Sequence, residues 1–200
     1  MNFEQNLVYH IFNQGNNQQK IFFNRDNYLY FLGKMRKHKL PHVDFLCYCL
    51  MPNHFHWLVR IHSVENQLDI SALNNLNTYT QRFRSITESI AVMLRSYTRA
   101  INKQEHRTGS LFRPHTKYKT GWIDEFITVD KYRAGPNDFR AFPDCDYGWE
   151  CFRYIHENPV KAGLCLFPED WEFSSARDFA ALRAGTLCNQ SLAKSLLRLP

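Results

Sequence analysis

The stretch MPNHFHWLV, residues 51–59, holds two histidines, His54 and His56, separated by one large apolar residue. On a β-strand, residues i and i+2 point to the same face of the sheet, with Cα atoms about 7 Å apart. The two imidazoles can then converge on one divalent ion, for which neutral imidazole is a good ligand, while Phe55 and Trp57 point into the core. The spacing also fits two polar residues at a strand edge, so the motif alone leaves both interpretations open.

A second pair of polar side chains lies in RYIHENPVKAGL, residues 153–164. Tyr154 and Asn158 are four residues apart, so on an α-helix they share one face and can meet the same ligand or metal. His156 lies between them, but a helix turns by about 200° over two residues, so His156 is not expected to act as a base for Tyr154. The other interpretation is that Tyr154 packs in the core and Asn158 ends the helix before Pro159.

Basic residues gather between residues 82 and 119 of a chain whose formal charge is +6. Within that stretch the acidic residues are Glu88 and Glu105. Aromatic residues lie among the basic ones, a combination that suits phosphate neutralisation and base stacking, although a solvated helix face and loop would give the same pattern. The residues first expected to contact backbone phosphates are Arg95, Arg99, Lys103, Arg113 and Lys117.

Strands and helices alternate irregularly along the chain. The apolar stretches 43–51 and 54–62 join through a Pro-Asn turn, which predicts an antiparallel hairpin, and a capping box at Ser85–Glu88 predicts the start of a long helix. The other expected elements are a strand from about residue 7, a helix over 27–40, a strand within 106–123, the tyrosine-bearing helix from 149 to Pro159, and a final helix over 171–185. This pattern predicts one α+β domain over residues 1–200, in which helices cover one face of an antiparallel sheet.

Composition excludes several classes of protein. Apolar residues make up 44% of the chain and charged residues 22%, which is ordinary globular composition without an apolar run long enough to cross a membrane. The N-terminal stretch does not read as a secretory signal. The six cysteines include no CxxC pair and are widely spread, which fits a reducing compartment, so we expect a cytoplasmic protein in which Cys47 and Cys49 are small buried apolar residues.

Together these motifs resemble a known family. MPNHFHWLV resembles the His-hydrophobe-His motif of the HUH single-tyrosine transposases, and YIHENPVKAGL resembles the nucleophile helix of their REP-associated tyrosine transposase branch. Three further stretches, YHIFNQGNNQQKIFF, SYTRAINKQEHRTGSLF and WEFSSARDF, are similar to the same branch. The resemblance runs in the family's order from about residue 7 to residue 179.

The resemblance implies a ferredoxin-like α+β domain, with a C-terminal helical extension from about residue 168, that cuts and rejoins single-stranded DNA near hairpins. By the motif match, His54 and His56 bind Mg²⁺ or Mn²⁺, Asn158 completes the metal site, and Tyr154 is the nucleophile that forms a 5′-phosphotyrosine intermediate. Such a transposase is expected in the prokaryotic cytoplasm, on the nucleoid when bound to DNA. The family includes monomers and dimers, so the resemblance does not decide whether the protein forms a homodimer.

Two other functions compete with the transposase interpretation. One is a domesticated protein that still binds DNA hairpins but is catalytically silent. The other is a metal-dependent hydrolase with a different substrate, which would activate water and have no need of Tyr154. Formation of a covalent DNA adduct separates the transposase from both. The loop over residues 133–148, rich in Gly, Pro and Asp, either shapes hairpin recognition or merely connects two elements.

Overall fold

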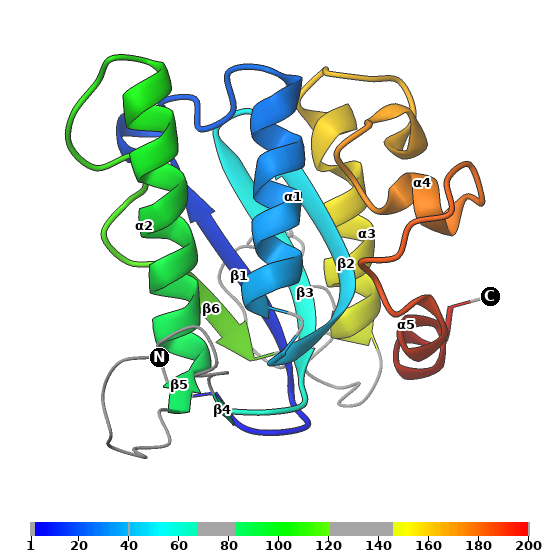
Figure 1. The fold of residues 1–200 in the computed structure, drawn as a ribbon. Coiled ribbons are helices and arrows are strands. Elements are labelled where there is room, and N and C mark those ends of the chain that lie inside the picture. The colour runs from blue at the N-terminus through cyan, green and yellow to red at the C-terminus, as the bar shows by residue number, and fades with distance from the viewer. Residues whose placement is uncertain (1–2, 40, 68–82, 121–145, 200) are drawn as a thin grey trace, which may run out of the picture.

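The computed structural model describes residues 3–39, 41–67, 83–120 and 146–199, and its elements are arranged as in Figure 1. The strands are β1 (Val8–Gln14), β2 (Val43–Met51), β3 (His54–Ile61), β4 (Glu65–Gln67), β5 (Phe83–Ser85) and β6 (Lys117–Thr120). The α-helices are α1 (Arg25–Lys39), α2 (Ile86–Gln104), α3 (Asp146–Lys161), α4 (Ala176–Phe179) and α5 (Gln190–Leu197). Short 3₁₀ turns lie at Asn16–Gln18 and Pro168–Asp170.

Four strands form one antiparallel sheet in the order β2-β3-β1-β6. With α1 and α2 as the crossovers, the chain runs β1-α1-β2-β3-α2-β6, which is the ferredoxin-like arrangement and confirms the expected fold class. The predicted hairpin is also confirmed, because Met51 pairs with His54 across the Pro-Asn turn. The predicted capping box is present as well: Ser85 accepts from the Glu88 backbone N–H, and the Glu88 side chain accepts from the Ser85 backbone N–H.

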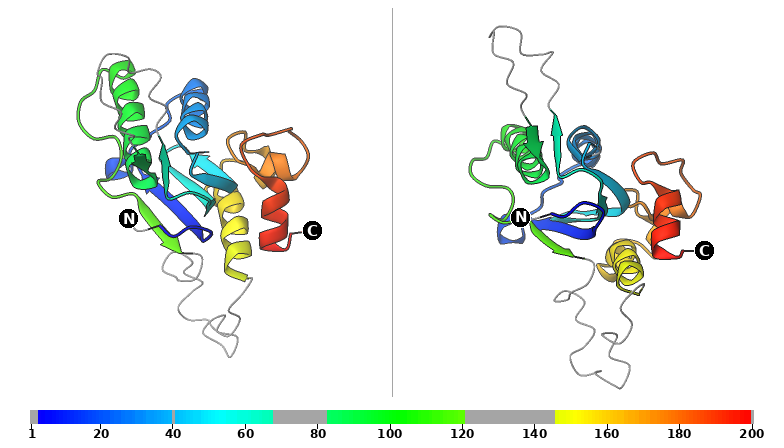
Figure 2. Two further views of the ribbon diagram at one scale, coloured as in Figure 1. Left: turned by 60° about the horizontal axis from the view of Figure 1, so that its bottom comes forward. Right: turned by 90° about the horizontal axis from the view of Figure 1, so that it is seen from below.

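One face of the sheet packs against α1 and α2 (Figure 2). Alternate residues of β3 point to this face, among them Phe55 and Trp57, whose ring centroids are 4.2 Å apart. Phe31 from α1 and Tyr97 from α2 meet edge to face above them, at 4.9 Å. All four side chains are fully buried. The expectation that Phe55 and Trp57 belong to the core is therefore confirmed.

The other face of the sheet is covered too, which corrects the expectation of helices on one face alone. Helix α3 crosses this second face, and α5 packs beside it (Figure 2). Cys47, Cys49 and Leu58 form a buried apolar cluster there with Cys151 and Ile155 of α3. Strand β2 is apolar at nearly every position because both of its faces are buried, and burial of Cys47 and Cys49 confirms that expectation.

Two helix boundaries differ from the sequence-based expectation. Helix α3 continues past Pro159 to Lys161. Proline has no backbone N–H, so in the last turn it removes only one hydrogen bond, and the last carbonyls of a helix have no partner within the helix in any case. The helix expected over 171–185 is reduced to α4, and Ala181 takes a left-handed conformation with φ 57° that ends it. The last helix is α5 instead.

Two predicted connections fall largely outside the described residues: the loop over 133–148 and most of the linker over 63–80. In the part of the chain that the structure describes, no helix is both long enough and apolar enough to cross a membrane.

Candidate metal and nucleophile site

Strand β3 places both histidines on the face of the sheet that α3 covers. Their side chains alternate with Phe55 and Trp57, and the two imidazole centroids are 5.0 Å apart. His56 is buried and His54 is partly exposed. The pair therefore lies side by side on one surface, as the strand spacing predicts.

Helix α3 brings the tyrosine and the asparagine to these histidines. The Tyr154 ring lies 5.6 Å from the His56 ring and nearly perpendicular to it. Asn158 donates through Nδ2 to the Tyr154 carbonyl at 3.0 Å, and its side chain is close enough to His54 to raise the pKa of that imidazole by hydrogen bonding. Residues about 100 positions apart in sequence thus meet at one place.

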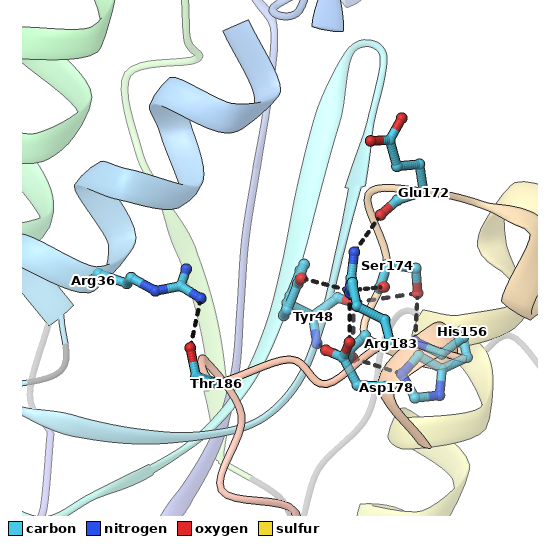
Figure 3. Close-up of polar contacts among 10 residues, drawn as sticks. Arg36, Tyr48, His156, Glu172, Ser174, Asp178, Arg183 and Thr186 are labelled. Carbon is cyan, nitrogen blue, oxygen red and sulfur yellow. Dashed lines mark hydrogen bonds and ion pairs between the residues drawn. The ribbon is translucent and has the colours of Figure 1, made fainter. Parts of the chain in front are cut away.

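A hydrogen-bonded network behind α3 holds the helix against β2 (Figure 3). His156 points away from the site, as predicted, and its Nε2 lies 2.8 Å from Ser175 Oγ. The same hydroxyl accepts from the Tyr48 backbone N–H at 2.9 Å, which ties the helix to the strand. Beside it, Arg183 donates to the Tyr48 hydroxyl and to the Asp178 carboxylate. His156 is therefore an anchor of the tyrosine helix and is not in position to act as a base.

Burial keeps both site histidines uncharged at neutral pH. Desolvation lowers the pKa of His54 to about 4, an effect that Asn158 partly opposes. The pKa of His56 is lowered well below its ordinary value by desolvation and by the neighbouring His10 and His54. A neutral imidazole has a free lone pair, so both rings are ready to bind a metal ion.

The donor set at the site fits a divalent ion with open coordination positions. Among the described residues, no group of three or more His, Cys, Asp or Glu side chains converges as a metal site, so within this part of the chain a third protein ligand would be of another type. Asn158, beside His54, offers an amide oxygen. Two imidazoles and one amide add no negative charge, which leaves such a site favourable for an anionic phosphate.

A hollow of about 200 Å³ opens over the histidines and the tyrosine. It is lined by His54, His56 and Tyr154, and also by Arg113 and Lys117, two of the residues expected to contact phosphates. Strand β1 adds residues that sequence reasoning missed: His10, Phe12, Asn13 and Gln14. The alternation of His10, Phe12 and Gln14 within β1 was visible in the sequence, but the pairing of β1 with β3 that brings His10 beside His56 was not.

A larger cleft of about 720 Å³ lies between α2 and the segment over residues 109–116. Arg95 and Arg99 line it from α2, and Ile90, Leu94 and Phe112 give it an apolar floor. Lys103 lines neither hollow. The two hollows share Asn13, Arg113 and His115, so they adjoin.

The wall between the two hollows is fastened to the sheet. Asn13 donates through Nδ2 to Thr116 Oγ1 at 2.9 Å, and the Arg113 backbone N–H donates to the Gln14 carbonyl at 2.9 Å. No acidic residue of the described chain lines either hollow. The surface that leads from α2 to Tyr154 is therefore continuous, ordered and positively charged.

The fold is shared with a known protein. No protein-family model matches the sequence, and no curated protein matches it. The structure is similar to a solved structure described as a REP-associated tyrosine transposase bound to a REP hairpin, with a TM-score of 0.52 and 16% sequence identity. The match covers 94% of this chain and 92% of that chain. At this identity the likeness establishes a common fold over nearly the whole chain.

Proposed function

We propose that the protein is a metal-dependent single-stranded DNA endonuclease and strand transferase of the HUH single-tyrosine type, related to the REP-associated tyrosine transposases. The observation that carries the proposal is the meeting of Tyr154, His54 and His56 at one pocket, with Asn158 one helical turn from Tyr154 and beside His54. The solved structure that shares the fold is described as bound to a hairpin, which supports hairpin DNA as the partner. A role in DNA transposition or recombination follows from that chemistry.

Tyr154 is the nucleophile in this proposal. Its hydroxyl oxygen attacks the scissile phosphorus, a Tyr154 Oη–P bond forms, and the P–O3′ bond breaks. The tyrosine loses its proton, and the departing 3′ oxygen gains one. The 5′-phosphotyrosine keeps the energy of the phosphodiester, so a free 3′-OH can later reverse the step and rejoin DNA without ATP.

His54, His56 and Asn158 are the residues that would hold Mg²⁺ or Mn²⁺. When bound, such an ion polarises a phosphate oxygen and favours in-line displacement. The protein's own contribution is to keep both imidazoles neutral through burial. Through the anchored helix α3, it also keeps the tyrosine ring against His56.

The DNA strand is proposed to run from the α2 cleft to the tyrosine pocket. Arg95 and Arg99 lie one helical turn apart in the cleft, and Arg113 lines both hollows. These three guanidiniums make no ion pair with a carboxylate among the described residues, so their charge is available to backbone phosphates. Lys117 then lies at the pocket itself, while Lys103 would contact DNA only beyond the cleft.

A covalent-adduct assay tests the proposal. Purified protein is incubated with Mn²⁺ and labelled single-stranded DNA that carries hairpins from its own genomic neighbourhood, and the products are run on a denaturing gel. We expect a protein–DNA band for the wild type that disappears with Tyr154→Phe and on chelation. Tyr30→Phe is the matched control, because Tyr30 is an exposed tyrosine of α1 that lines neither hollow.

Two other results would favour one of the competing functions over the transposase. Hairpin binding on a native gel without an adduct, for any hairpin or metal, would favour the catalytically silent DNA-binding protein. Metal-dependent hydrolysis of another substrate that survives Tyr154→Phe would favour the hydrolase.

A further inference from the structure

Both site histidines use the same ring nitrogen for a hydrogen bond within the protein. His54 Nδ1 lies 2.6 Å from Asn53 Oδ1, and His56 Nδ1 lies 2.9 Å from His10 Nε2. The two partners come from different places, the turn before β3 and the middle of β1. In each ring Nε2 is then the nitrogen left for a metal ion.

The Asn53 contact fixes the tautomer of His54. An amide oxygen can only accept a hydrogen bond, so His54 Nδ1 must carry the proton and donate it. In a neutral imidazole the lone pair then lies on Nε2. Asn53 itself is held in place, because its Nδ2 donates to the Gln18 carbonyl at 3.3 Å.

The His10 contact can be made in two ways, since either imidazole can donate. If His10 Nε2 donates, the proton of neutral His56 lies on Nε2 and that nitrogen has no lone pair for a metal ion. If His56 Nδ1 donates, Nε2 of His56 is free. His10 is 3% exposed and His56 7% exposed, so water has little access to either ring and the contact between them decides which tautomer His56 adopts.

We propose that His10 and Asn53 are positioning residues that accept hydrogen bonds from Nδ1–H of His56 and His54 and so present both Nε2 atoms to the metal ion. Partners of this kind orient the ligands of metal sites and set their tautomers. His10 also lies 6.3 Å, ring to ring, from Tyr154. With its Nε2 occupied by His56, that nitrogen is not available to take the tyrosine proton.

The tautomers can be read directly from the wild-type protein. Long-range ¹H–¹⁵N correlation spectra of the ¹⁵N-labelled full chain, recorded without metal at pH 7.5, report which ring nitrogen of each histidine carries the proton. His54→Gln and His56→Gln identify the two signals. We expect Nδ1–H for both histidines, and a proton on Nε2 of His56 would overturn the role of His10.

Mn²⁺ affinity, measured by electron paramagnetic resonance, tests what the contact does. Loss of an outer partner typically weakens metal binding by about 10–100-fold, so we expect that range for His10→Leu. His10→Gln, whose Oε1 can accept in place of Nε2, should stay within about 3-fold of the wild type if acceptance is what matters. Equal losses in the two variants would contradict the proposal.

His42→Leu is the matched control, because His42 is also 3% exposed but lines neither hollow. It should leave both Mn²⁺ affinity and hairpin binding in EDTA unchanged. The inference depends on the proposed function only for the use of the metal ion. If no adduct forms, the proposed function fails, while the tautomers and the Mn²⁺ affinities still decide this inference.

Discussion

The two faces of the β1–β3 pair differ although the same two strands build both. Toward α1 and α2, the side chains are apolar except for Asn13 at one end, with Ile11, Phe55 and Trp57 fully buried. Toward α3, the same strands carry His10 and His56, and apolar packing resumes only further along the strands.

This difference assigns separate roles to the two faces. Burying a polar ring is unfavourable unless it is hydrogen-bonded, and here the buried imidazoles bond to each other. The face toward α1 and α2 therefore supplies stability, and the end of the opposite face is kept polar for chemistry. Substitutions on the face toward α1 and α2 should lower the free energy of unfolding, whereas substitutions at the polar end of the opposite face should lower activity.

The largest expected effect is on the apolar face. Trp57→Ala removes a ring that stacks on Phe55 and meets Phe45 edge to face at 5.9 Å, and it should lower the free energy of unfolding by about 3–5 kcal/mol. Urea unfolding measures this change. Phe167→Ala is the control, because Phe167 is 60% exposed and its loss should cost less than about 0.5 kcal/mol. A loss below about 1 kcal/mol for Trp57→Ala would contradict the role of this face.

On the polar face the expected loss is one of activity. His54→Ala should lower adduct formation by roughly 100-fold or more, because loss of an outer partner alone costs about 10–100-fold at metal sites. The free energy of unfolding should change by less than about 1 kcal/mol, since His54 is partly exposed. His62→Ala, outside both hollows, should leave adduct formation unchanged. Full activity of the His54→Ala variant would show that His54 is not a ligand of the metal ion.

Acid should destabilise the α3 side of the sheet, where burial holds histidines on both sides of that helix uncharged. Burial lowers the pKa of His156 to about 3 and of His54 to about 4, whereas an unfolded histidine titrates near about 6.5. Below about pH 6.5 these histidines are protonated in the unfolded chain but stay neutral in the folded chain. The free energy of unfolding is therefore highest above that pH. It falls toward pH 5 by up to about 1.4 kcal/mol per pH unit for each histidine.

Urea unfolding in EDTA at pH 7.5 and at pH 5 checks this pH dependence. His156→Gln removes one of the titrating groups, and its loss of stability between the two values should be smaller than that of the wild type. A loss that is equal or larger would show that His156 does not titrate in this way.

The smallest effects are expected in the α2 cleft. Arg95→Ala and Arg99→Ala should each weaken DNA binding and reduce the slope of log affinity against log salt by about 1, as for loss of one phosphate contact. Lys37→Ala, an exposed lysine of α1 outside both hollows, is the matched control. An unchanged salt slope in both arginine variants would place the DNA elsewhere.

The sequence predicts most elements that carry the site, because the relevant signals are local. The hairpin register follows from the Pro-Asn turn, and the spacing of Tyr154 and Asn158 follows from helical geometry. The position of His10 could not be predicted, since it depends on the pairing of strands that are 46 residues apart. The continuous apolar run of β2 signals the second buried face, which the prediction of helices on one face of the sheet leaves out.

The bounds of the final predicted helix were missed for a different reason. Before α4, Ser174 Oγ accepts from the Ala176 backbone N–H and Ser175 Oγ donates to the Tyr48 carbonyl, and these contacts hold that segment outside a helix. After α4, Arg183 donates hydrogen bonds to the Asp178 carboxylate and to the Tyr48 hydroxyl. These contacts depend on tertiary structure, and helical periodicity over 171–185 does not anticipate them.

The most direct test of the central claim is to locate the covalent bond. Protein incubated with hairpin DNA and Mn²⁺ is digested with trypsin and nuclease, and the peptide that retains a nucleotide is sequenced by tandem mass spectrometry. We expect a nucleotide joined through its 5′-phosphate to Tyr154, within the peptide that follows Arg153. A nucleotide on any other residue would contradict the assignment of this tyrosine as the nucleophile.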